Sequence, residues 1–153
     1  MSAPENLAAG TRELASWGRR LAALIVDALV LGFVIAATVL AAGLEAQDLR
    51  DRMADGEMLL FIFIFLIPEA IYYTALIGSR NQTFGKMALR IEVLDAENRS
   101  PIGYGRAFRR WLATATLRSL FYIPSVVDHL WPLGDRRKQT LHDKFARSVV
   151  VRT

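Results

Sequence analysis

The stretch LAALIVDALVLGFVIAATVLAAGL occupies residues 21–44, and Asp27 is its only ionisable side chain. A helix needs about 20 predominantly apolar residues to cross the core of a bilayer, so this stretch is long enough to span a membrane. Residues 58–77 form a second stretch of this kind, in which Glu69 is the only ionisable side chain. Two such stretches in a chain of 153 residues predict an integral membrane protein with two transmembrane helices.

The first apolar stretch also has the position of a secretory signal peptide, since Arg19 and Arg20 precede it and small residues lie at its end. The core of a signal peptide has only about 7–15 apolar residues. Residues 21–44 exceed that length and contain an acid, so we interpret them as a retained helix.

The overall composition agrees with a membrane protein. Hydrophobic residues make up 53% of the chain, whereas a soluble domain has about 45–50% even with glycine included. There is no cysteine, which excludes disulfides, thiolate metal sites and a cysteine nucleophile. The net charge of +4 is typical of basic cytoplasmic loops that contact anionic lipid headgroups. We therefore expect a lipid bilayer, and no nucleic acid, as the partner.

Charged residues divide the rest of the chain into acidic and basic segments. Residues 45–57 contain five acids and two arginines, whereas residues 78–110 contain seven basic side chains and three acids. Because basic loops tend to remain in the cytoplasm, we expect the N-terminus and the loop at 78–107 inside and the acidic linker outside.

Two segments have the pattern of β-strands. Residues 89–94 alternate apolar and polar side chains, as a half-buried strand does, and residues 148–151 form a matching stretch, SVVV. A lone strand would leave its backbone N–H and C=O groups unpaired. We therefore expect the two strands to pair on the cytoplasmic side of the membrane.

A third apolar region at residues 108–133 is interrupted by five ionisable side chains and has Pro124 near its middle. A simple third crossing would place the tail at 134–153, with its six Lys or Arg residues, outside, which the distribution of basic loops disfavours. We favour a segment that enters and returns, bending near Pro124, with a plain third span as the alternative. The predicted fold is an all-α membrane protein of one domain, residues 1–153, with two transmembrane helices, a third broken or re-entrant helical segment and a small cytoplasmic β-element.

Asp27 and Glu69 are costly in membrane helices, where an acid raises the free energy of insertion by about 2.5–3.5 kcal/mol. At a rise of about 1.5 Å per residue, Asp27 lies about 9 Å and Glu69 about 12 Å from the inner ends of their helices, so the two acids reach similar depth. Tyr72 lies one turn beyond Glu69 and adds a hydroxyl. The functional hypothesis is a site for Na⁺ or H⁺ formed by paired carboxylates.

The structural alternative is a salt bridge that joins helices, with Arg20 or Arg118 as the cation. Arg20 precedes Asp27 by seven residues and therefore lies on the same face of the helix. Spacing alone favours this structural role. It leaves open whether Asp27 pairs with Arg20, Arg118 or Glu69.

Two further polar motifs give weaker indications. Gly85-Lys86 lacks the glycine spacing of a phosphate-binding loop and is followed by Met87. His142-Asp143 has no nucleophile beside it, so we expect only a local hydrogen bond there. We predict no enzymatic activity, no metal site and no cofactor.

A basic and aromatic stripe lies at the start of the third apolar region. Arg106, Arg109 and Arg110 stand close to Phe108 and Trp111 in the sequence. Basic clusters at a membrane surface are typical of contact with anionic lipid headgroups. We therefore expect the three arginines to face lipid.

Four motifs in a fixed order resemble a known family. RLAALIVD opens the first span at residues 20–27, NQTFGK follows at 81–86, RIEV at 90–93 and LHDK at 141–144. The combination is similar to the RDD family of bacterial membrane proteins, named for one arginine and two aspartates, and it extends over residues 17–151. By position, the three residues are Arg20, Asp27 and Asp143. The resemblance implies a multi-pass protein of the bacterial inner membrane. The basic loops and the expected pairing of the strands predict that its N-terminus and C-terminus lie in the cytoplasm.

The chain departs from the pattern of that family at three positions. Asn81 and Phe84 stand where the family commonly has glycine and proline, and Arg147 stands where it has a glycine. The arginine argues against a special tight backbone at that point.

The resemblance implies either a transporter or an accessory module of a membrane complex. Our first hypothesis is a small Na⁺/H⁺ transporter or transporter subunit in which Asp27 and Glu69 bind the cation. Two spans do not readily enclose a transport path, so it would act as an oligomer through small residues such as Gly32 and Ala36. The alternative is a non-catalytic scaffold in which Arg20 and the two aspartates tie the helices to the strands.

Overall fold

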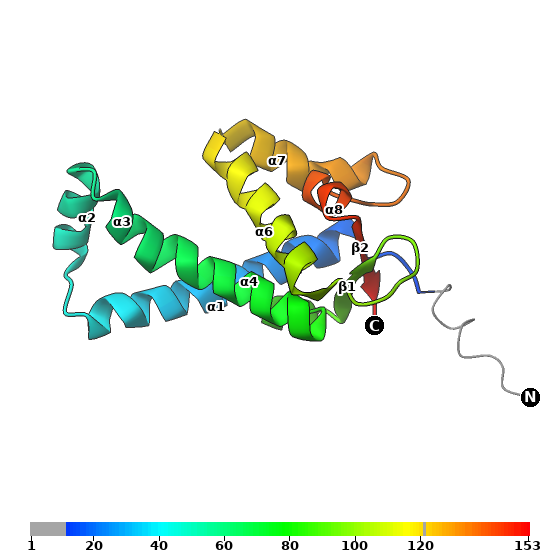
Figure 1. Ribbon diagram of the computed structural model, residues 1–153, viewed down its shortest axis with the longest axis horizontal. Coiled ribbons are helices and arrows are strands. Elements are labelled where there is room, and N and C mark those ends of the chain that lie inside the picture. The colour runs from blue at the N-terminus through cyan, green and yellow to red at the C-terminus, as the bar shows by residue number, and fades with distance from the viewer. Residues whose placement is uncertain (1–11, 121) are drawn as a thin grey trace, which may run out of the picture.

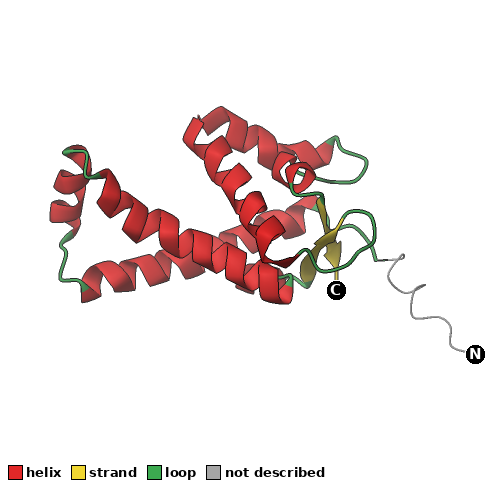
Figure 2. Ribbon diagram, in the orientation of Figure 1, coloured by secondary structure: helices red, strands yellow, loops and turns green. Residues whose placement is uncertain are grey.

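The computed structural model describes residues 12–120 and 122–153. Helices dominate it, and two short strands lie at one end (Figures 1 and 2). The helices in chain order are α1 (Trp17–Ala41), α2 (Ala46–Ala54), α3 (Met58–Phe61), α4 (Ile67–Arg80), α5 (Phe84–Ala88), α6 (Gly103–Leu120), α7 (Tyr122–Leu130) and α8 (Leu141–Phe145). The other described elements are the π-helical turn η1 (Ile62–Leu66), the 3₁₀ turn η2 (Trp131–Leu133) and the strands β1 (Ile91–Asp95) and β2 (Ser148–Arg152).

Two long helices extend away from the strands. One is α1, and the other is the continuous helix formed by α3, η1 and α4. Figure 1 shows that α2 joins them at the end farthest from the sheet. The predicted acidic linker thus contains a helix of its own, with Asp48 in its first turn and Arg52 in its last, where these charges favour the helix dipole.

The outward faces of these helices are strongly apolar. Trp17–Ala41 and Met58–Arg80 are the two helices of the described residues that are long and apolar enough to span a membrane. Phe33 and Leu40 are each 76% exposed, and Leu59 is 71% exposed. The core helix of a soluble protein would bury such side chains, whereas hydrocarbon accepts them. The prediction of two candidate membrane-spanning helices is confirmed.

The ends of the spans differ from the predicted ones for local reasons. α1 begins before residue 21 because the Ser16 side chain accepts a hydrogen bond from the backbone of Arg19 and caps the helix. It ends before residue 44, close to Gly43, whose φ of 66° is left-handed. The second span continues past residue 77 to Arg80 and ends at Asn81, which also has a positive φ of 59°.

Pro68 affects the second span without breaking it. A proline has no N–H for the carbonyl one turn before it, and its ring clashes with that carbonyl. The turn directly before it, η1, is π-helical, and α4 continues from there to Arg80. The widened turn thus accommodates the proline inside the span.

The two predicted strands pair as expected. β1 and β2 are antiparallel, with Val93 opposite Val150. β1 begins at Ile91 rather than at residue 89, because Leu89 ends α5 and Arg90 has a left-handed φ of 53°. Leu14 adds a bridge to Val151, so the three residues from Glu13 to Ala15 lie against the sheet.

The third apolar region forms a helical hairpin. Helices α6 and α7 contact each other, and α6 also packs along α4. α6 ends at Leu120 and α7 begins at Tyr122. Pro124 therefore lies in the first turn of α7, where no backbone N–H bond is needed. Neither helix is among the candidate spans of the described residues, so entry of this hairpin into the membrane stays a prediction.

Candidate functional site

Asp27 is fully buried on α1 and is surrounded by hydrogen-bond donors. Its Oδ1 accepts from the Tyr72 hydroxyl and from the backbone N–H of Gly85, each at 2.7 Å. Its Oδ2 accepts from the Thr83 hydroxyl at 2.6 Å and lies 3.7 Å from the Nζ of Lys86. The carboxylate therefore joins α1 to α4 and to the start of α5.

Gly85 permits this contact because it has no side chain. A Cβ at this position would lie 2.1 Å from the backbone oxygen of Ala23 and 2.8 Å from Oδ1 of Asp27. No real Cβ approaches a backbone atom so closely, so only glycine lets α5 lie against α1. The glycine of the rejected phosphate loop thus has a structural role.

Glu69 has a different partner from Asp27. Its Oε2 accepts from a guanidinium nitrogen of Arg118 at 2.6 Å, which joins α4 to α6. The structure brings Tyr72 to Asp27, but the contacts of the described residues do not include a pairing of Asp27 with Glu69, Arg20 or Arg118. A shared carboxylate site for a cation is therefore not formed by direct contact between the two acids.

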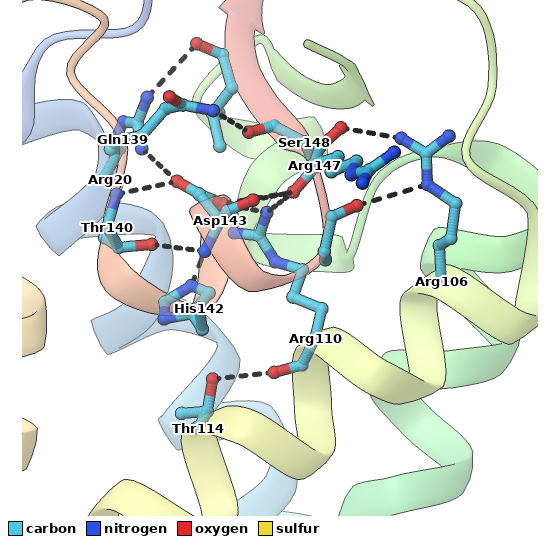
Figure 3. Close-up of polar contacts among 12 residues, drawn as sticks. Arg20, Arg106, Arg110, Thr114, Gln139, Thr140, His142, Asp143, Arg147 and Ser148 are labelled. Carbon is cyan, nitrogen blue, oxygen red and sulfur yellow. Dashed lines mark hydrogen bonds and ion pairs between the residues drawn. The ribbon is translucent and has the colours of Figure 1, made fainter.

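Asp143 lies at the centre of a second buried cluster, which Figure 3 shows. Arg20 of α1 donates to its Oδ2 at 2.8 Å, and Arg110 of α6 forms a short ion pair with its Oδ1. Thr140 and Asp143 form a capping box, in which each side chain accepts from the backbone N–H of the other at 3.1 Å. Arg20 also donates to the carbonyl of Val150 at 3.3 Å, so α1, α6, α8 and β2 meet at one carboxylate.

The charges around Asp143 determine its ionisation. Burial alone would raise the pKa of its carboxyl, but the charges of Arg110, His142 and Arg20 hold that pKa well below its usual range. The carboxylate is therefore ionised throughout the physiological pH range. It pairs with two guanidinium groups at once.

A third buried acid, Asp128 of α7, caps α8. Its Oδ1 accepts from the backbone N–H of His142 at 3.0 Å, and its Oδ2 lies 2.6 Å from Nδ1 of the same residue. Burial and the charge of Arg110 lower the pKa of the His142 imidazole below its usual value, against the opposing effect of Asp128. A neutral imidazole that donates from Nδ1 satisfies this geometry.

The sequence indicated several of these groups only weakly. Asp128 is one of the five ionisable side chains that interrupt the third apolar region, and an acid inside such a region signals a partner. Thr83 and Lys86 belong to the NQTFGK motif, but nothing in their spacing points to Asp27. The predicted local hydrogen bond of His142 exists, and it is formed with a residue of another helix.

The predicted basic stripe is divided by the fold. Arg110 is only 7% exposed because its guanidinium lies on Asp143. Arg106 forms an ion pair with Asp95 at 2.6 Å and donates to the carbonyl of Arg147 at 2.6 Å. Arg109 is exposed, and its side chain forms no ion pair or hydrogen bond with the described residues. Lipid contact stays a prediction, and Arg109 is the residue placed for it.

The expectation about Arg147 is wrong. Its φ of 48° is the left-handed conformation that glycine favours, so the tight backbone exists despite the arginine. The reason lies in the turn from α8 into β2, where the N–H of Arg147 bonds to Lys144 and its carbonyl accepts from the N–H of Ala96. These bonds hold the conformation.

A cavity of about 300 Å³ lies between these clusters. Four cationic side chains line it: Arg20, Lys86, Arg110 and Arg118. Glu69 also lies on its wall, as do His129 and His142. Leu21, Leu24, Tyr73, Ile77 and Trp111 provide apolar and aromatic surface.

Comparisons with known proteins agree with the motifs. The model of the RDD family matches residues 14–147, which is most of the chain. Comparison with curated proteins found no match. Comparison with solved structures found none either.

Proposed function

This chain belongs to the RDD family, and on that premise we propose that it is a non-catalytic membrane module that holds a small β-element against the inner ends of two transmembrane helices. The single observation that supports this role is the position of Asp143. One buried carboxylate receives Arg20 from the first span and Arg110 from α6. This cluster holds α1, α6 and the β-element in a fixed arrangement, and its carboxylate is fully engaged by the two arginines.

We also propose that both termini lie in the cytoplasm at a bacterial inner membrane. Glu13 accepts from the backbone N–H of Arg152, and Ala15 donates to the carbonyl of Val150 at 2.9 Å. The segment before α1 and the last strand therefore lie on the same side. The basic character of the loop and tail supports a cytoplasmic location for that side.

A module of this kind acts by contact with other membrane components. Gly32 and Ala36 are exposed on α1, and a Cβ added at Gly32 would meet nothing within 4 Å. Small exposed residues allow another helix to approach closely. They support a homo-oligomer or a membrane partner, and anionic lipid remains the proposed contact of the basic face.

A small Na⁺/H⁺ transporter is the second candidate. It is favoured by one observation, which is that the Glu69–Arg118 pair lies on the wall of the cavity. A proton or cation that reached Glu69 would compete with Arg118. Asp27 offers less, because its two oxygens already accept three hydrogen bonds of 2.6–2.7 Å.

Cation-dependent proton flux in liposomes distinguishes the two functions. We expect no flux from the purified protein, and a lower melting temperature for Asp27→Asn in detergent because its buried hydrogen bonds are weakened. Asp51→Asn, which changes an exposed acid of α2, serves as the control and should melt like the wild type. Flux that disappears in both Asp27→Asn and Glu69→Gln, with folding unchanged, would establish transport instead.

A further inference from the structure

The cavity between α1, α4 and α6 has the size and lining of a ligand site. Its volume of about 300 Å³ lies at the lower end of the range of about 300–1,000 Å³ typical of such sites. Leu21, Leu24 and Ile77 provide aliphatic surface, and Tyr73 and Trp111 provide aromatic surface. Apolar walls with a few convergent polar groups are the usual composition of a small-molecule site.

The polar groups on its wall carry an excess of positive charge. Arg20 and Arg110 share the single carboxylate of Asp143, so one guanidinium charge has no counter-ion within that cluster. Lys86 lies 3.7 Å from an oxygen of Asp27, and that carboxylate already has three shorter hydrogen bonds. An anion placed between these cations would complete the charge balance.

Two further properties of the wall favour an anion. Burial and the charge of Arg110 lower the pKa of Lys86 to about 8, so a nearby negative charge would favour the charged form of this lysine. The buried indole Nε1 of Trp111 has no acceptor among the described residues. Buried donors are nearly always satisfied, and Trp111 belongs to the residues that line the cavity.

The position of the cavity selects an amphiphile over a free anion. Its apolar walls belong to α1 and α4, the two candidate spans, whose outer surfaces are exposed and apolar. Its cations come from the start of α1, from α5 and from α6. A ligand that fills both parts has an oxyanion headgroup joined to an apolar chain.

We propose that this cavity binds one anionic membrane lipid, with the oxyanion of its headgroup among Arg20, Lys86 and Arg110 and its chain leading along α1 and α4 toward the bilayer. The proposal rests on the membrane location of the module. It is independent of the choice between scaffold and transporter, because lipid retention and ion flux are separate measurements.

Native mass spectrometry of the detergent-solubilised chain tests this inference. The protein is mixed with equal amounts of phosphatidylglycerol and phosphatidylcholine, and the lipid retained by each chain is counted. We expect one phosphatidylglycerol per chain, with a preference of about tenfold, which corresponds to about 1.4 kcal/mol. Inorganic phosphate in excess should not displace it, because it lacks the chain.

Three variants identify the site. Lys86→Gln removes a cation from the wall and should lower the preference by about tenfold, and Thr114→Phe should fill the cavity and abolish retention. Arg50→Gln removes an exposed arginine of α2, which does not line the cavity, and should change nothing. Circular dichroism and gel filtration confirm that each variant is folded. Equal retention by all four proteins, or displacement by phosphate alone, would overturn the proposal.

Discussion

The segments α5–β1 and α8–β2 have the same local design and opposite electrostatics. Each begins with a capping threonine, Thr83 or Thr140, followed by a helix of five residues and a strand of five residues. Between helix and strand each has an arginine with a left-handed φ, Arg90 or Arg147. The central residues of the two strands lie opposite each other, Val93 and Val150, so the two units are related by an approximate two-fold axis.

Corresponding residues of the two units meet an acid from a different helix. The second helical residue donates its backbone N–H to a carboxylate in both: Gly85 to Asp27, and His142 to Asp128. The third helical residue is Lys86 in one unit and Asp143 in the other. The same backbone arrangement thus holds a cation beside the cavity in the first unit, and an anion paired with two arginines in the second.

The α8–β2 unit should be the more sensitive of the two to a substitution, because the buried carboxylate of Asp143 lies at its centre. Asp143→Asn leaves Arg20 and Arg110 buried without their carboxylate. Removal of one partner from a buried ion cluster costs about 3–5 kcal/mol. We expect the largest fall in melting temperature here, measured by circular dichroism in detergent. Asp135→Asn, which removes a more exposed partner of Lys144, is the control, and an equal fall in both would refute the difference in burial.

The α5–β1 unit depends on shape rather than on charge. A Cβ in Gly85→Ala would lie 2.1 Å from the carbonyl oxygen of Ala23, so α5 must move away from α1 and Asp27 loses a donor. Overpacking of this kind costs about 1–3 kcal/mol. Gly105→Ala is the matched control on α6, where a Cβ would meet nothing within 4 Å. Similar melting temperatures for the two variants would show that the close contact is absent in solution.

The sequence predicted the spans well because their signal is local. The length of an apolar stretch and the cost of a charge within it do not depend on distant residues, and the predicted spans correspond to α1 and to the helix from Met58 to Arg80. The two strands were predicted for the same reason. Their ends shifted because capping and left-handed residues such as Arg90 are not visible in an apolar pattern.

The pairings in the site were harder to predict because they join distant segments. Spacing along one helix placed Arg20 on the same face as Asp27. The partner of Arg20 is instead Asp143, which lies 123 residues away in the sequence. Asp27 pairs instead with groups around α5, and Glu69 with Arg118. The resemblance to the family grouped Arg20, Asp27 and Asp143 without indicating that they form two separate clusters.

Acid should weaken the α8–β2 unit through His142. Because the folded protein lowers the pKa of this imidazole below its usual 6.5, the unfolded chain binds more protons below that pH, and stability falls as pH falls. Arg110, Asp128 and Asp143 are the charged groups that face it. We expect a loss of up to about 1.4 kcal/mol per pH unit below 6.5, seen as a falling melting temperature. His142→Gln should flatten that dependence between pH 7 and 5, and an unchanged slope would assign the acid effect to another group.

A rise in pH should stabilise the α5–β1 unit through Lys86, and this is the smallest of the expected effects. Its pKa falls from 10.5 to about 8 in the folded protein, so the unfolded chain binds more protons between these values and stability rises with pH across that window. Arg20, Arg110, Asp27 and Asp143 are the charges that act on it. Lys86→Met keeps the three other donors of Asp27 and removes the titration of the lysine. Its free energy of unfolding at pH 7 should therefore equal that of the wild type or exceed it by about 1 kcal/mol or less, seen as an equal or slightly higher melting temperature. The rise above pH 8 should be smaller in the variant. A variant that is clearly less stable at pH 7 would mean that the lysine stabilises the carboxylate of Asp27. Its charge would then not be available to bind an anionic ligand.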